Sequence, residues 1–113
     1  MRLVILESPY AGARKTNLDY AYRAMLHSLS LGEAPFASHL LYPQFLDDND
    51  AEQRALGMGA GLEWVQKADA TVVYMDLGVS PGMTLGINRA INLGKPVEYR
   101  TIGYIPELND AGL

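Results

Sequence analysis

The sequence predicts an α/β fold, a small doubly wound parallel sheet with helices on both faces, and three observations support this. Short apolar runs alternate with segments of helical periodicity along the chain. These runs are continuous rather than alternating, as in strands covered on both faces. No linker, repeat or low-complexity segment divides the 113 residues, so residues 1–113 form a single domain.

Four strands are expected, in the order that a βαβ pattern requires. The apolar run 3–6 predicts the first strand, and residues 36–42, closed by Pro43, predict the second. Residues 70–75 form the most strongly β-favouring segment of the chain, and a last strand is expected over 96–99.

Three helices are expected between the strands. Asn17 is the predicted N-cap of the first helix, which ends near Gly32 and buries a stripe. Asp50 is the predicted N-cap of a second helix over 51–65, and a third runs over 83–93 with Gly94 at its C-cap. The buried stripe of the first helix is expected to contain Leu18, Ala21, Tyr22, Met25 and Leu29, with His27 on the solvated face.

Composition excludes several function classes. The net charge of −4, without a basic block, gives no electrostatic footprint for DNA binding. The absence of cysteine excludes disulfides and thiolate metal sites. The first apolar run is too short for a signal peptide, and no stretch approaches the roughly 20 residues that span a bilayer. A cytoplasmic protein without membrane contact is expected, and the sequence does not distinguish a cellular from a phage origin.

Parallel α/β sheets bind ligands outside the carboxyl ends of their strands, which directs attention to the loops 8–16, 43–50 and 76–82. The first loop carries Lys15 and Thr16 but lacks the glycines of a Walker A loop, and Gly12 alone cannot form a dinucleotide-binding fingerprint. What remains is a turn with one glycine and two cations before a helix, which suits an anion. A simple solvated turn explains these residues equally well.

The third loop combines Asp76, two glycines and the dipeptide Ser80-Pro81 ahead of a helix. Amides at such a helix start can hold a phosphate or a sugar hydroxyl. The alternative is purely structural, with Asp76 as a turn former and Ser80 as an N-cap followed by proline in the first turn.

Together these loops resemble those of the nucleoside 2-deoxyribosyltransferase-like superfamily, which includes deoxyribosyltransferases and nucleoside-monophosphate N-glycosidases. In that family the first strand ends in a small-residue turn, matched by Ser8-Pro9-Tyr10. A later strand ends in Asp, and a glycine-rich loop opens a helix that closes in GKPV. The matching residues here are Asp76, Gly78, Gly82, Ala90 and Gly94-Lys95-Pro96-Val97.

The chain departs from the resemblance at the catalytic centre. Enzymes of the family carry a nucleophilic Glu in a pattern such as GYELG, and this sequence has Thr84 at that place. A neutral hydroxyl is a poor substitute for a carboxylate nucleophile. Asp76 and Glu7 remain as the candidate catalytic carboxylates at strand ends.

The resemblance implies a pocket built from the first and third loops. Arg14 would pair with an anion, Asp76 would accept hydrogen bonds from sugar hydroxyls, and His39 is a half-buried strand residue nearby. A lone histidine without cysteine predicts no metal, and no cofactor is expected. The predicted ligand site comprises Ser8, Pro9, Tyr10, Gly12, Arg14, His39, Asp76, Gly78, Ser80, Gly82 and Met83.

Three glycines, Gly57, Gly59 and Gly61, stand inside the second predicted helix, where each costs about 1 kcal/mol relative to alanine. Close approach of a ligand, of another helix or of a second chain would explain them. A homo-oligomer through the face of Gly57 and Gly61, with Trp64 at its edge, is the expectation.

Two functions follow from these observations. The first is a protein that binds a nucleotide or ribosyl phosphate and has lost the nucleophile. Such a scaffold would suit a small phage protein that sequesters a nucleotide signal. The second is an N-glycosidase or deoxyribosyltransferase that uses Asp76 or Glu7 in place of the missing Glu.

Overall fold

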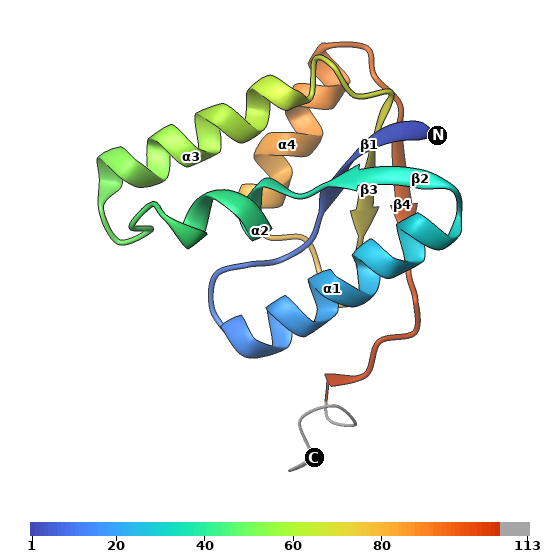
Figure 1. Ribbon diagram of the computed structural model, residues 1–113, viewed down its shortest axis with the longest axis horizontal. Helices are drawn as coiled ribbons and strands as arrows, with labels where there is room; N and C mark the ends of the chain where they lie inside the picture. The colour runs from blue at the N-terminus through green and yellow to red at the C-terminus, as the bar shows by residue number, and fades with distance from the viewer. Residues whose placement is uncertain (107–113) are drawn as a thin grey trace.

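The computed structural model describes residues 1–106, and its four parallel strands lie in the order β2-β1-β3-β4. The doubly wound α/β prediction is therefore confirmed (Figure 1). Within the described residues no helix is long and apolar enough to cross a bilayer. The elements are β1 (Arg2–Glu7), α1 (Arg14–Ser30), β2 (Glu33–Phe36), α2 (Ser38–Leu41), η1 (Tyr42–Gln44), α3 (Ala51–Trp64), β3 (Ala70–Tyr74), α4 (Pro81–Asn92) and β4 (Val97–Arg100).

The sheet divides the core into two layers because successive side chains of a strand point to opposite faces. Val4 and Leu6 of β1 pack in one buried cluster with Tyr20 of α1. Ile5 points the other way and packs with Val65, which follows α3. As a result α1 covers one face of the sheet, and α3 and α4 cover the other (Figure 1).

The second strand was predicted at the wrong place. β2 covers Glu33–Phe36, and the segment after it forms the short helix α2, so His39 lies on a helix. Strand β2 pairs with β1 from Arg2 opposite Glu33 to Ile5 opposite Phe36. Glu33 and Pro35 are residues that disfavour a strand, so the sequence pattern does not indicate one here. Proline is tolerated here because β2 is an edge strand.

The first helix begins earlier than predicted, and its buried face is rotated. Asn17 lies inside α1 rather than at its N-cap, and its side-chain amide donates to the backbone carbonyls of Tyr10 and Ala11. Tyr22 and Leu29 are exposed, contrary to the expected stripe. The residues of α1 that are buried are Asn17, Tyr20, Ala21, Ala24 and Ser28.

His27 is also not a solvated residue. Its Nδ1 lies 2.9 Å from the Tyr74 hydroxyl, and the two rings meet edge to face. The prediction for this face of α1 was wrong for a simple reason. The helical stripe was assigned by apolar residues, whereas the inner face of α1 carries polar groups that find partners on the sheet.

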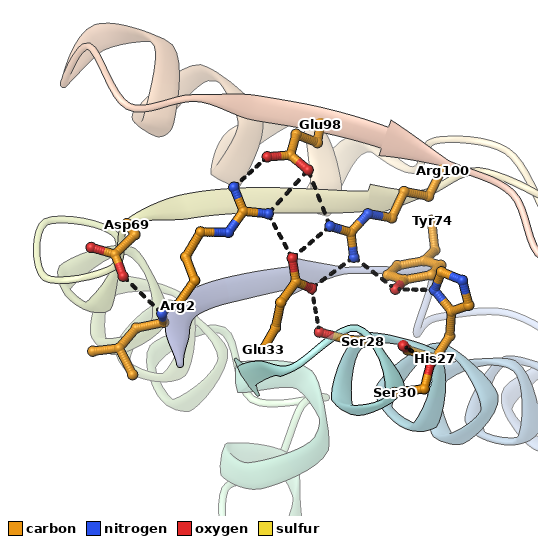
Figure 2. A network of polar contacts seen from close by, with 10 residues as sticks. Arg2, His27, Ser28, Ser30, Glu33, Asp69, Tyr74, Glu98 and Arg100 are labelled. Carbon is orange, nitrogen blue, oxygen red and sulfur yellow. Dashed lines mark hydrogen bonds and ion pairs between the residues drawn. The ribbon is translucent and has the colours of Figure 1, made fainter.

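Those partners belong to a buried ionic network that joins all four strands and α1, with Tyr74 of β3 accepting from Arg100 (Figure 2). Glu33 of β2 is 5% exposed and accepts from Arg2 of β1 at 2.6 Å. It also accepts from both terminal nitrogens of Arg100 of β4, at 2.8 and 2.7 Å, and from the Ser28 hydroxyl at 2.8 Å. Glu98 bridges the two arginines from the exposed side.

Replacing Glu33 by Gln should reduce the free energy of unfolding by about 3 kcal/mol, because two guanidinium groups lose a buried partner. The hydrogen bonds from Arg100 and then Arg2 lower the pKa of Glu33 from 4.5 to about 2. A lowered pKa adds stability above pH 4.5 that is lost as the pH falls toward 2. Urea titrations of both proteins between pH 2 and 7 should show this loss in the wild type only.

Glu98→Gln is the matched control. It removes a carboxylate that contacts the same arginines but whose side chain is 40% exposed, so the cost should stay below about 1 kcal/mol. Equal losses for the two variants would show that burial of Glu33 does not matter.

The glycines of α3 allow a close contact within the chain. A Cβ added at Gly61 would lie 2.6 Å from Oγ and 2.8 Å from Cβ of Ser38 on α2. One added at Gly57 would lie 3.2 Å from a methyl of Leu46, whereas Gly59 faces open space. The contact with α2 accounts for Gly61 without a second chain, and the homo-oligomer stays a prediction.

Gly61→Ala should therefore lower the free energy of unfolding by about 1–3 kcal/mol, the usual cost of overpacking. Gly59→Ala, two residues away in the same helix, should raise it by up to about 1 kcal/mol. Chemical denaturation checks the pair. A stabilising Gly61→Ala would contradict the proposed contact.

Candidate functional site

A cavity of about 340 Å³ lies between the end of β1, helices α2 and α3, and the first turns of α4. The loops after β1 and before α4, far apart in the sequence, line the same cavity. Its lining residues are Ile5, Glu7, Ser8, Tyr10, Ala11, Ser38, His39, Tyr42, Pro43, Leu46, Asp48, Gln53, Arg54, Gly57, Met58, Gly61, Leu62, Val65, Ser80, Pro81, Gly82, Met83, Leu85 and Gly86.

Glu7 is the carboxyl group of the cavity floor. It ends β1 and points to the α4 side of the sheet, where a Cβ added at Gly86 would overlap its carboxyl group. Burial raises the pKa of Glu7 to about 8. A carboxylic acid with such a pKa can donate a proton or a hydrogen bond near neutral pH.

Ser8 and His39 form a hydrogen-bonded pair beside Glu7. The Ser8 hydroxyl, in a residue only 3% exposed, lies 2.7 Å from Nε2 of His39. Burial lowers the pKa of His39 to about 4, so the imidazole is neutral at pH 7. The Tyr10 ring meets it edge-on at 6.4 Å between centroids, which fixes the loop after β1 against α2.

The start of α4 also lines the cavity. Ser80 is its N-cap, with its hydroxyl accepting from the Met83 amide at 3.2 Å, and Pro81 follows in the first turn. The Met83 side chain, 2% exposed, packs against the sheet with Val73 and Ile87. This anchoring turns the first residues of α4 toward the cavity, where the helix dipole favours an anion.

Charged side chains stand at the rim. Arg14 lies over the Tyr10 ring at 4.7 Å and pairs with Asp48 at 3.6 Å, which draws the β1 loop toward the segment before α3. Arg54 of α3 also lines the cavity, is exposed, and forms no ion pair within residues 1–106. It is a cation available to a ligand.

The structure brings together seven of the residues named from the sequence, and leaves five others outside the lining. Gathered in the cavity are Glu7, Ser8, Tyr10, His39, Ser80, Gly82 and Met83. Outside the lining are Pro9, Gly12, Arg14, Asp76 and Gly78.

Asp76 is occupied elsewhere. Its carboxylate accepts from the Tyr20 hydroxyl at 2.6 Å and from the amides of Ile102 and Tyr104 at 3.0 Å. These bonds fasten the chain after β4 to α1. Thr84, which the sequence resemblance sets against a nucleophilic Glu, is exposed, donates to the Ser80 carbonyl at 3.2 Å and lies outside the cavity lining.

The contribution of α2 and α3 to the cavity lining was not predicted from the sequence. Ser38 was not recognised as a lining residue because the segment around His39 was assigned to a strand, and Gln53 and Arg54 of α3 were not recognised either, whereas Asp48 lies in the loop 43–50 expected at the ligand edge. The four-residue spacing of Gly57 and Gly61 was the available signal for a close approach. Among the described residues no three His, Asp or Glu side chains are grouped to hold a metal ion.

Several solved structures share this fold. A 2-deoxyribosyltransferase from Bacillus psychrosaccharolyticus superposes with a TM-score of 0.71 at 23% identity, over 91% of this chain and 75% of that one. A CMP N-glycosidase from Clostridium botulinum gives 0.57 at 16% identity, over 96% and 78%. A 2-deoxyribosyltransferase from Leishmania mexicana gives 0.62 at 12% identity, over 99% and 72%.

Comparison with curated protein sequences gives no match. A family model described as a domain of unknown function, DUF7768, matches residues 2–100, nearly the whole of the described chain. The chain therefore belongs to the DUF7768 family and has a nucleoside deoxyribosyltransferase-like fold.

Proposed function

We propose that this protein binds a nucleotide, with the nucleoside in the cavity and the phosphate at its rim. The observation that carries the proposal is the cavity that both the end of β1 and the start of α4 line. Its volume of about 340 Å³ lies within the range of small-molecule sites, roughly 300–1,000 Å³. Two solved proteins of this fold, a 2-deoxyribosyltransferase used in nucleoside synthesis and a CMP N-glycosidase, support the ligand class.

The lining suits a base and a sugar. Met58, Leu62 and Val65 supply apolar surface on the α3 side, and Tyr10 and Tyr42 supply aromatic rings. Ser8, Ser38 and Gln53 add hydrogen-bonding groups to the same walls. Apolar walls with a few polar groups are typical of sites that orient a flat ligand.

We assign the phosphate to Arg54 and the start of α4, which both line the cavity. A guanidinium group binds phosphate through paired N–H donors, and a helix N-terminus adds a favourable field. Ser80 and Gly82 at the start of α4, which line the cavity, are uncharged, and the first turn of α4 contains no acidic residue that would repel a phosphate.

Binding without family-type glycosyl transfer is favoured by Thr84. Its hydroxyl is held by the Ser80 carbonyl, and it lies outside the lining of the cavity. A pocket that binds a nucleotide but has no nucleophilic side chain can hold the nucleotide without cleaving it. Capture of a nucleotide signal, in a cell or on behalf of a phage, is the role we infer for such a pocket.

An N-glycosidase is the second candidate, and Glu7 is the observation that favours it. An acid with a pKa of about 8 inside the cavity can protonate a departing base. Incubation of the protein with nucleoside monophosphates separates the candidates. A binder returns the nucleotide intact, whereas a glycosidase releases free base that chromatography detects.

Arg54→Ala should weaken binding of a nucleoside monophosphate by about 10-fold or more, since a hydrogen bond to a charged group contributes about 1.5–3 kcal/mol. The corresponding nucleoside should bind the variant and the wild type equally. Isothermal titration calorimetry with both ligands measures the difference.

Lys67→Ala, which removes an exposed cation just beyond α3 and outside the lining, is the control and should change neither affinity. Equal weakening of nucleoside and nucleotide by Arg54→Ala would contradict the phosphate assignment. Failure of every nucleoside and nucleotide to bind the wild type would refute the proposed function.

A further inference from the structure

Glu7 occupies an unusual position for a carboxyl group. It is the last residue of β1, opposite Val73 of β3 in the sheet register, at the floor of the cavity. Gly86 of α4 leaves the space that its carboxyl group fills. Two nearly buried apolar residues, Val65 and Met83, line the same cavity.

Among the described residues no cation pairs with this carboxyl group. Within residues 1–106 Glu7 forms no hydrogen bond or ion pair, and the buried network holds Arg2 and Arg100 against Glu33. The charged groups of the cavity lining are Asp48, which is paired with Arg14, and Arg54 at the rim. The remaining titratable groups that line it are Tyr10, His39 and Tyr42.

A carboxyl group in such a place resists ionisation because burial penalises its charged form. Its pKa of about 8 leaves it mostly protonated at pH 7, when His39 is neutral as well. The inner cavity then carries no charge. A protonated carboxyl group has one O–H donor that an ionised one lacks.

We propose that Glu7 acts in the site as a neutral acid that donates a hydrogen bond, and that the bound ligand presents an uncharged acceptor to it. A carbonyl oxygen or an unprotonated ring nitrogen of a nucleobase has this chemistry. This inference rests on the proposed nucleotide binding and names the group that reads the base. The competing arrangement is an ionised Glu7 that accepts hydrogen bonds from sugar hydroxyls.

Glu7→Gln separates the two arrangements, because an amide donates a hydrogen bond at every pH and carries no charge. The probes are adenosine and cytidine, whose rings do not titrate over the range used, together with adenine and cytosine. Wild-type affinity should stay level from pH 6 to 7 and fall toward 10-fold per pH unit above pH 8. Glu7→Gln should bind within about 3-fold of the wild type at pH 6.5 and show no such fall.

Loss of binding in Glu7→Gln, or wild-type affinity that rises with pH, would overturn the proposal. If no probe binds the wild type at pH 6.5, the recognition of a base fails, and titration with nucleoside monophosphates then tests the proposed function separately. The protonation of Glu7 is then still decided by a measurement that needs no ligand.

That measurement is stability against pH. A pKa raised from 4.5 to about 8 on folding means that stability is fully present below pH 4.5 and is lost as the pH rises toward 8. The free energy of unfolding of the wild type should therefore fall relative to Glu7→Gln between pH 5 and 8 and level off above. Glu63→Gln, at an exposed carboxyl group of α3 outside the lining, should run parallel to the wild type. A constant difference between wild type and Glu7→Gln would show that Glu7 is ionised, and the proposal would fail.

Discussion

The buried carboxylate of Glu33 is the interaction on which the arrangement of this sheet depends. It binds Arg2 and Arg100, which come from β1 and β4, and the Ser28 hydroxyl of α1 (Figure 2). Two cations balance one buried anion, and Glu98 supplies the second negative charge from the exposed side. Because removal of a single partner would leave an uncompensated buried charge, the network favours one arrangement of strand ends over its alternatives.

Two carboxyl groups of this sheet, those of Glu33 and Glu7, have pKa values shifted in opposite directions. Glu33 is surrounded by cations, and its pKa is lowered to about 2, so it serves structure as an anion. Glu7 has no cation beside it, and its pKa is raised to about 8, so it faces the cavity as an acid. The same side chain at two strand positions thus has two protonation states near neutral pH. Burial is common to both, and only the partners differ.

The contrast with Asp76 shows how a loop acid can be structural rather than functional. Asp76 follows β3 and stands at the edge of the sheet where ligands bind in this class of fold. Its carboxylate is nevertheless used by Tyr20 and by two backbone amides after β4. Asp76 therefore does not line the cavity, whose polar lining includes Glu7, Ser8, His39 and Ser80 instead.

The sequence by itself determined the parallel α/β class, the strands β1 and β3, and the capped start of α3; for α4 it offered the Ser80 cap as one of two alternatives and began the helix two residues late. These features follow from local rules, since continuous apolar runs form buried strands, and Asp50 and Ser80 accept amides of their own helices. Only the tertiary structure decided the place of β2, the inner face of α1 and the membership of the cavity. Glu33 and His27 are polar residues whose placement depends on partners supplied by distant segments. Their roles therefore could not be read from neighbours in the chain.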